Sequence, residues 1–402
     1  MKQIRFLFLL FPIAVYAQPK APNALKELVN ASFTYAPKMA ELETQSAMAA
    51  AKTDYMSSYL MPSINAFGTY NYLYPIGQVQ FPTGPGQTLN INFQPNNNVN
   101  LGLNASYLLF DFGRARSVIN KSKEELKTSK LNIDQAKSQL ATQVAGIYFS
   151  MASLQQSISI EDSLLLILEE NLDITQKRVS RGDALQMDVM NLRSTIELEK
   201  NRKSELQSAF NKQKILLEYV SGKSPASLEL SFTVDEQQEL MSLLQQAELQ
   251  NPDFAVAKSR LEASRLEAKQ LEKSFLPTLS INAGTGFRNG YQPDIYEMKY
   301  NYAVGFSLNA PLYQGGRSRI QKRINGSALH LNELAIDQIQ KATRRDLMTA
   351  QSDLLSAKER LSNAEQMVEN AKEAVRVGEV RYANGTATHT DLMNAISNLQ
   401  RV

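Results

Sequence analysis

The sequence predicts a mainly helical protein with a smaller transmembrane β part. Three observations support this fold class: two very long heptad patterns, four short runs that alternate apolar and small polar residues, and an internal duplication that relates the two halves of the chain. We expect very long coiled-coil helices that continue into membrane-spanning strands.

The composition of the 402 residues excludes several classes of function. The chain has no Cys, no Trp and only two His, which excludes disulfide frameworks, thiolate metal sites and Cys nucleophiles. Its 43 Lys and Arg nearly balance 40 Asp and Glu, whereas a nucleic-acid binder needs a clustered basic excess. We therefore expect no nucleic-acid partner, no cofactor, no metal site and no catalytic residue.

The first 17 residues have the pattern of a secretory signal peptide. Lys2 and Arg5 precede an apolar stretch at 6–15, and Val15-Tyr16-Ala17 fits the small-x-small rule for cleavage before residue 18. A membrane anchor is the alternative, but this stretch is shorter than the roughly 20 residues that a spanning helix needs. The mature chain is therefore expected to be exported, and any membrane role must use strands or a surface helix.

The two halves of the chain repeat each other at a fixed offset. Residues 178–194 and 381–397 are identical at seven of 17 positions, and the same offset of 203 pairs Gly113-Arg114 with Gly316-Arg317. Such a density of identities at one offset indicates an internal duplication.

The duplication divides the mature chain into two structural repeats. The first, 18–222, is expected to contain a helix, a β-hairpin at about 63–110, a long helix at about 114–178 and a return helix at about 183–221. A linker or equatorial segment, 223–239, precedes the second repeat, 240–402, with a helix, a hairpin at about 278–312, a long helix at about 317–381 and a return helix from about 386. If this last helix matched its counterpart it would end near residue 424 or 425, so we expect it to be truncated.

Each long helix carries a seam of apolar residues seven positions apart. The seam consists of Val144, Met151, Ile158, Leu165, Leu172 and Val179 in the first copy and of Leu347, Leu354, Leu361, Val368, Val375 and Tyr382 in the second. Sixty-five helical residues reach roughly 98 Å, which is longer than a single domain core. Other helices must therefore pair with each long helix along its length, as in a coiled coil or a wall of helices.

Four runs of about ten residues have the pattern of tilted membrane-spanning strands. They lie at 64–74, 100–109, 279–287 and 301–309, each with one apolar face and one face of Asn, Ser and Gly. The connecting segments 75–99 and 288–299 are rich in Pro, Gly and Asn and are expected to be exposed loops. A soluble sheet packed on the helices is the alternative.

Four strands are too few to close a membrane barrel, because the smallest single-chain barrel has about eight and lipid tolerates no open sheet edge. Several chains must therefore contribute to one barrel. Two copies would give eight strands and a filled interior, whereas three would give twelve and room for a passage.

Together these features resemble the TolC family of outer-membrane efflux factors. The resemblance covers essentially the whole mature chain, and its most specific elements are the duplication, the Gly turns, and the paired sequences Leu-Phe-Asp-Phe-Gly-Arg and Leu-Tyr-Gln-Gly-Gly-Arg. It implies a homotrimer whose four strands per chain share a twelve-stranded barrel in the outer-membrane lipid, with a periplasmic α-barrel of long helices. Such a trimer would passively conduct substrates for a tripartite efflux or type I secretion system, together with a periplasmic adaptor (membrane fusion) protein and an inner-membrane transporter.

The resemblance also implies a periplasmic constriction after the second Gly turn. Tyr382 and Asp391 match the family's pattern, whereas Ala387 stands in the place of an Arg and Asn394 in the place of a second acidic residue. The ion-pair lock of the family is therefore incomplete here. Asp188 occupies the corresponding place in the first repeat.

A three-fold axis would repeat Asp188 and Asp391 into six carboxylates, whose field would favour cations if they faced the passage. The alternative is that both simply stabilise helix starts through the helix dipole, with Asp183 or Thr386 as caps.

Gly182 and Gly385 are expected to supply the backbone of two tight helix-to-helix turns. The resemblance implies that these turns are the exposed tips that contact the adaptor.

Two other classes of function remain open from the sequence. A periplasmic or surface coiled-coil scaffold would have the same helices without channel activity. A hydrolytic enzyme is a weaker alternative, because no nucleophile, base and orienting group can be identified together. Arg114 and Arg317, which follow the strands, are expected to anchor the chain at the membrane edge rather than to bind substrate.

Overall fold

The structure is a computed structural model that describes residues 22–225, 227–229 and 240–401. The predicted signal peptide and most of the predicted linker lie outside these residues. The chain folds into two compact units: the described parts of Met1–Glu41, Ile133–Pro252 and Ile339–Val402 form one, and Leu42–Asn132 with Asp253–Gln338 form the other. We call them the helical unit and the sheet unit.

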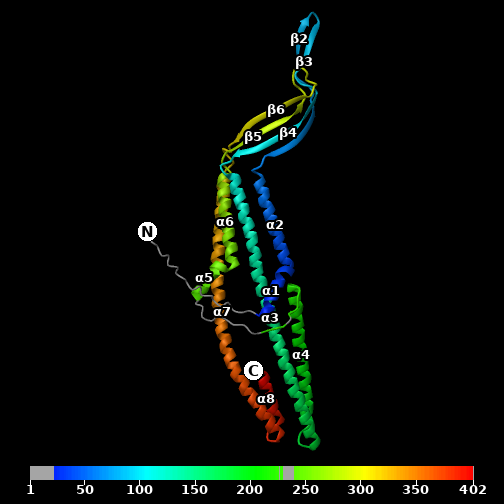
Figure 1. The fold of residues 1–402 in the computed structure, drawn as a ribbon, viewed down its shortest axis with the longest axis vertical. Coiled ribbons are helices and arrows are strands. Elements are labelled where there is room, and N and C mark those ends of the chain that lie inside the picture. Colours follow the sequence, from blue (N-terminus) through cyan, green and yellow to red (C-terminus); the bar gives the residue numbers. More distant parts are fainter. Residues whose placement is uncertain (1–21, 226, 230–239, 402) are drawn as a thin grey trace, which may run out of the picture. The chain divides into compact units, whose positions relative to one another are not determined.

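The order of elements repeats itself along the chain (Figure 1). The elements are α1 (Asn23–Tyr35), α2 (Pro37–Ser58), β1 (Ser63–Tyr72), β2 (Gln78–Gly84), β3 (Gln87–Asn92), β4 (Asn97–Phe110), α3 (Arg114–Arg181), α4 (Gln186–Ser221), α5 (Leu240–Gln250), α6 (Pro252–Lys273), β5 (Thr278–Arg288), β6 (Lys299–Asn309), α7 (Arg317–Ala383) and α8 (His389–Arg401). Pro37 and Pro252 each begin a helix of 22 residues, where the missing N–H of proline costs no hydrogen bond. Proline thus sets the same helix start in both repeats.

The sheet unit contains a four-stranded antiparallel sheet in the order β1-β4-β5-β6. Each repeat supplies two neighbouring strands, and the pairing of β4 with β5 joins them. Among the residues that the structure describes, the outer strands β1 and β6 each have a neighbour on one side only. The sheet therefore presents two edges of unpaired backbone groups.

The strand register sorts the side chains onto two chemically different faces. Up to the bulge between Leu108 and Phe110, all exposed large apolar side chains of the sheet share one face. They are Ile64, Tyr70, Tyr72, Leu101, Leu103, Tyr107, Phe287, Tyr300, Tyr302, Val304, Phe306 and Leu308. We call this the apolar face. The opposite, polar face consists mainly of Asn, Ser, Thr and Gly.

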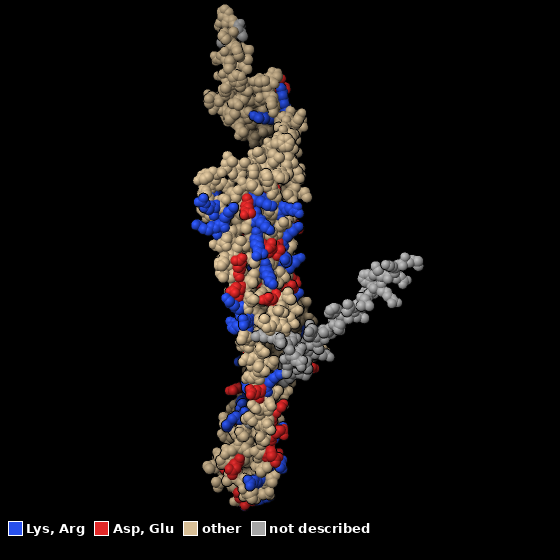
Figure 2. Space-filling model, turned by 90° about the vertical axis from the view of Figure 1, so that its left-hand side faces the viewer, with Lys and Arg blue, Asp and Glu red and all other residues tan. Residues whose placement is uncertain are grey.

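Charged residues are scarce on the sheet. Its four strands contain only Arg288 and Lys299, which are register partners at the end of the β5–β6 pair farthest from α7. Figure 2 shows that blue and red side chains gather over the helices, with few over the strands. A sheet without charge on either face along most of its length suits a hydrocarbon environment on one side.

Residues 78–92 correct the prediction that 75–99 is an exposed loop. They form the separate hairpin β2–β3, in which Val79 pairs with Ile91 and Phe81 with Leu89. The Pro and Gly residues of this segment indicated a loop, but two short alternating runs flank the turn, and cross-strand apolar pairs stabilise them. The second predicted loop, 288–299, contains no strand between Arg288 and Lys299.

The helical unit is held together by two clusters of apolar residues. In one, Leu25 and Leu28 of α1 pack against α3 and α4. In the other, side chains of α3, α4, α7 and α8 meet beside the helix turns. The members of this second cluster are Leu164, Leu165, Leu168, Leu192, Ile196, Val375, Tyr382, Leu392 and Ile396. We call it the turn cluster.

The predicted heptad seams differ in how fully they are covered. In α3, Val144 and Met151 have no exposed surface, because α1 and α4 pack on them. In α7, Val375 is 6 % exposed beneath α8, whereas Leu361 is 62 % exposed. The seam of α7 is thus buried where α8 lies beside it.

Among the described residues, no helix combines the length and the apolar character needed to cross a membrane.

Candidate functional site

The two turns that connect the helices have the same backbone geometry. Gly182 and Gly385 adopt positive φ angles of 84° and 73°. After each glycine, a backbone N–H reaches back five residues: Asp183 donates to the Arg178 carbonyl and Thr386 to the Arg381 carbonyl, both at 2.9 Å. This is the Schellman arrangement, which ends a helix with glycine in the left-handed region. Both turns therefore need glycine for its backbone conformation.

Asp188 and Asp391 lie in the first turns of the helices that follow. Asp391 accepts hydrogen bonds from the Thr388 backbone N–H at 2.9 Å and from the Thr388 hydroxyl at 2.7 Å, while its own N–H donates to that hydroxyl at 3.2 Å. This reciprocal pair is a capping box. The Thr388 hydroxyl and N–H lower the pKa of the exposed Asp391 carboxyl below its usual value.

Asp188 makes the equivalent contact in the first repeat. Its carboxylate accepts a hydrogen bond from the Leu185 backbone N–H at 3.2 Å. The predicted caps Asp183 and Thr386 are wrong, because the helices begin later than expected and Leu185 and Thr388 precede their first turns. The Thr386 hydroxyl instead donates to the Arg381 carbonyl at 3.1 Å.

Tyr382 is in the last turn of α7, and its side chain lies in the turn cluster against α3. Its side chain is 3 % exposed, and its hydroxyl is 3.0 Å from the Thr175 hydroxyl. The Arg178 guanidinium stacks over the Tyr382 ring, 4.5 Å from its centroid, and donates a hydrogen bond to the Tyr382 carbonyl. This group of contacts fastens the last turn of α7 to the last turns of α3.

The remaining residues at the turns belong to α8. Asn394 is exposed. The ring of His389 lies 6.0 Å from that of Tyr382. Burial lowers the pKa of His389, and the Asp188 carboxylate acts in the opposite direction. The structure thus brings His389 and Asp188, from the two return helices, close enough to interact.

Sequence reasoning missed the contacts of Arg178 and Thr175 with Tyr382. Arg178 carried a signal, because it is identical to Arg381 in the duplication. Thr175 carried none, since nothing in a helical pattern indicates which side chain on another helix will face it.

Sequence reasoning also missed a carboxyl pair between α3 and α4, of which Glu161 is buried and Glu199 is partly exposed. Glu161 is 4 % exposed, and burial together with the neighbouring Glu199 raises its pKa to about 7. Arg202, 3.9 Å away, opposes this rise. Gln400 of α8 donates a hydrogen bond to Glu199 at 3.0 Å. The two carboxyl groups are 38 positions apart in the sequence, and no local pattern pairs them.

No group of three or more His, Asp or Glu side chains in the described part of the chain is placed to hold a metal ion.

The chain matches a known protein family over most of its length. The sequence profile of outer membrane efflux proteins matches residues 29–223 and 243–402. The chain belongs to the outer membrane efflux protein family. This confirms the resemblance to TolC-family factors and places the protein in the outer membrane, with a large helical part in the periplasm. The family consists of efflux channel proteins rather than enzymes.

Individual relatives share about a quarter of their aligned residues with the chain. The toluene efflux pump outer membrane protein TtgF of Pseudomonas putida is 25% identical over 221 residues, which are 54% of this chain and 46% of that protein. The pyoverdine export outer membrane protein OpmQ of Pseudomonas putida is 23% identical over 252 residues, 62% of this chain and 52% of that one. The chain thus spans about half the length of these relatives.

Solved structures show the same fold at lower identity. The outer-membrane channel OprN aligns with a TM-score of 0.76 at 19% identity, covering 94% of this chain and 85% of that one. The outer membrane protein VceC of Vibrio cholerae aligns with a TM-score of 0.75 at 18% identity, covering 94% and 90%. The chain therefore has the mainly helical fold of outer-membrane channels.

Proposed function

We propose that the protein is the homotrimeric outer-membrane channel of a tripartite efflux or type I secretion system. It conducts passively what an inner-membrane transporter delivers, and a periplasmic adaptor joins the two. The observation that carries this proposal is the four-stranded sheet with one apolar face, one polar face and two unpaired edges.

The edges explain why more than one copy is required. In lipid every backbone N–H and C=O needs a partner, so β1 of one copy must pair with β6 of the next until the sheet closes. Three copies give twelve strands, with the apolar face toward lipid and the Asn, Ser and Gly face toward an aqueous passage. The scarcity of charge on the strands supports the same orientation.

The helix turns supply the second part of the proposal. Gly182 and Gly385 form the tips that contact the adaptor, because each turn exposes backbone at the end of a very long helix. In the trimer, Asp188, Asp391 and Asn394 line a constriction near these tips. Tyr382 contributes from within the helical wall, because its bonds to Thr175 and Arg178 fix where α7 and α8 stand relative to α3.

The names of two relatives refer to toluene and to pyoverdine. These differ so widely in polarity that family membership alone does not select a cargo. The transporter that loads the channel would make that selection.

Purification in detergent followed by planar-bilayer recording tests the proposal. We expect a trimer that forms ion-conducting pores. A monomeric protein that does not conduct would overturn the proposal, and a protein released from membranes by carbonate without detergent would favour a coiled-coil scaffold instead.

A further inference from the structure

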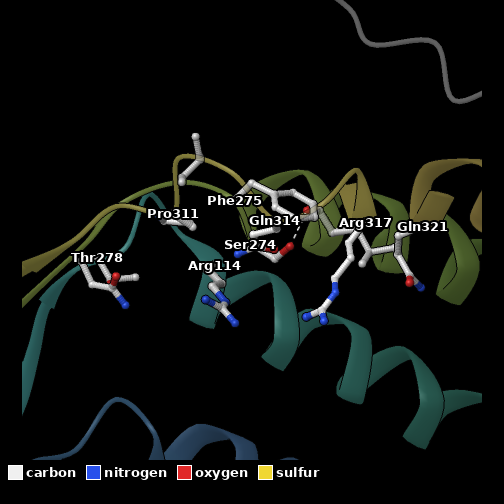
Figure 3. Close-up of a pocket in the computed structure, with 11 residues that line it drawn as sticks. Arg114, Ser274, Phe275, Thr278, Pro311, Gln314, Arg317 and Gln321 are labelled. Carbon is white, nitrogen blue, oxygen red and sulfur yellow. Dashed lines mark hydrogen bonds between the residues drawn. The ribbon is translucent and has the colours of Figure 1, made fainter. Parts of the chain in front are cut away.

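A cavity of about 320 Å³ lies where the strands of the sheet unit meet its helices. Figure 3 shows Arg114 at the start of α3 and Arg317 at the start of α7, both extending along this pocket. The two arginines are equivalent residues of the internal duplication. The other lining residues are Leu271, Ser274, Phe275, Leu276, Thr278, Asn309, Pro311, Gln314 and Gln321.

The strand residues of the cavity belong to the polar face of the sheet. Thr278 and Asn309 are register partners, two positions before Ser280 and two after Ser307 respectively. Since side chains alternate along a strand, these four residues share one face, opposite Leu279 and Leu308. The cavity therefore opens on the side that the proposed function assigns to the aqueous passage, and not on the lipid side.

The cavity contains two positive charges and no negative one. None of its lining residues is acidic, and in the described ranges neither Arg114 nor Arg317 forms an ion pair. Asp111, nearby in the chain, does not line this cavity: its carboxylate accepts hydrogen bonds from the backbone N–H groups of Gly113 at 2.9 Å and Ala115 at 2.6 Å. Lys273 adds a third cation beside this turn, with its ammonium 3.4 Å from the Gly113 carbonyl.

The backbone before each arginine is built in the same way in both repeats. Phe112 and Gly113 have φ angles of 56° and 76°, and Gly315 and Gly316 have φ angles of 60° and 75°. In each repeat, two successive residues with left-handed backbone conformation turn the chain sharply from strand to helix. In the first repeat one of these residues is Phe112, which adopts this conformation less readily than glycine does. Each turn thereby places an arginine at the first position of a long helix, where the positive end of the helix dipole adds to its field.

We propose that Arg114 and Arg317 form an oxyanion-binding site in the passage, through which the channel favours solutes that carry carboxylate or phosphate groups. This proposal rests on the proposed function. Guanidinium groups bind such oxyanions through two parallel N–H donors, and the Thr278 hydroxyl and the Gln314 amide supply further donors. In a trimer the site is repeated into six guanidinium groups around the passage.

The test uses the full chain in two double variants. R114Q/R317Q removes both cations of the cavity. R116Q/R319Q removes the same charge from the equivalent pair two residues further along α3 and α7, about 200° around each helix and outside the cavity lining. Sodium pyrophosphate is the probe in both measurements.

The first measurement is isothermal titration of the protein in detergent with sodium pyrophosphate. We expect R114Q/R317Q to weaken binding by about tenfold or more, as loss of charge-assisted bonds does, while R116Q/R319Q stays close to the wild type. If pyrophosphate binding is weakened equally in both variants, the net charge of the protein explains the effect, and the proposal is overturned. Competition by phosphatidylglycerol in mixed micelles would assign the site to lipid headgroups and also overturn it.

The second measurement is the reversal potential in a KCl gradient across a planar bilayer. R114Q/R317Q should shift this potential toward cation preference and relieve block by pyrophosphate, and the control R116Q/R319Q should do neither.

Unchanged ion selectivity in an R114Q/R317Q channel that still conducts would overturn the oxyanion site but leave the proposed channel function unaffected. If the wild type does not conduct but still binds pyrophosphate in a way that depends on Arg114, the proposed function is overturned and the oxyanion site is retained. Loss of the trimer in R114Q/R317Q alone would show that the arginines bind a neighbouring subunit, which overturns the proposal.

Discussion

At the scale of single residues, the contacts of Tyr382 connect the two repeats. Its hydroxyl and the Thr175 hydroxyl are both buried and are hydrogen-bonded to each other. A buried hydroxyl that loses its partner costs free energy, because water cannot replace the bond. The bond therefore favours the arrangement in which α7 lies against α3 beside the turns.

We predict that Tyr382→Phe lowers the stability of the helical unit by about 1 kcal/mol, since it removes the bond and keeps the ring. Thermal unfolding followed by circular dichroism measures this change. Thr175→Val should have a similar effect, and the double variant should cost less than the sum of the two. Strictly additive losses would show that the two hydroxyls do not interact.

Glu161 makes the stability of the helical unit depend on pH. Its pKa in the folded protein is raised to about 7 by burial and by Glu199. A group with a raised folded-state pKa stabilises the fold fully below its unfolded pKa and loses this contribution as pH rises through the folded value. The charged groups that face it are Glu199 and Arg202 on α4 and Asp162 on α3, and Gln400 of α8 binds Glu199.

We therefore expect the midpoint temperature of thermal unfolding to decrease in the wild type as pH rises from about 5 to about 8. The decrease should be smaller in Glu161→Gln, which keeps the shape of the side chain but cannot ionise. Glu197→Gln, an exposed acid on α4 paired with Lys200, is the matched control. A wild-type slope that persists in Glu161→Gln would assign the pH dependence to another group.

At the scale of elements, the two helix turns were predictable in position but not in detail. The paired glycines marked them, because only glycine adopts the left-handed conformation there without strain. The caps are not the residues that the sequence suggests, although Thr388-His389-Thr390-Asp391 has the spacing of a capping box. The hairpin β2–β3 was missed because its turn residues outnumber its apolar ones, while its stability comes from cross-strand pairs.

Alanine at Gly182 or Gly385 should destabilise the turns by roughly 1–2 kcal/mol, the cost of a left-handed backbone for a residue with a Cβ atom. No atom lies within 4 Å of the position that a Cβ would occupy at either glycine, so the cost is purely conformational. Asparagine, which enters this region more readily, should recover part of the loss. Equal unfolding midpoints for the alanine and asparagine variants would contradict this explanation.

At the scale of the whole molecule, the long helices and the sheet followed from periodicity alone. Val144 and Met151 of the heptad seam are fully buried, and the alternation of Tyr302, Val304 and Phe306 became an apolar face. The cavity at Arg114 and Arg317 does not follow from periodicity, and the sequence alone predicts only that both arginines anchor the chain. The position of the cavity depends on which face of the sheet Thr278 and Asn309 occupy. The register between β5 and β6 sets this face, and no single segment of the sequence shows it.

The orientation of the sheet in the membrane gives the most direct prediction for the assembly. Val304 is 65 % exposed on the apolar face of β6, and Ala303, its neighbour in the chain, lies on the polar face. Arginine at a lipid-facing position near the bilayer centre costs about 2–4 kcal/mol, whereas a position facing water carries no such penalty. Val304→Arg should therefore reduce the amount of trimer in the membrane fraction, and Ala303→Arg should leave it nearly unchanged. Because the two variants differ by one position and carry the same charge, equal insertion of both would mean that β6 does not have lipid on one side and water on the other.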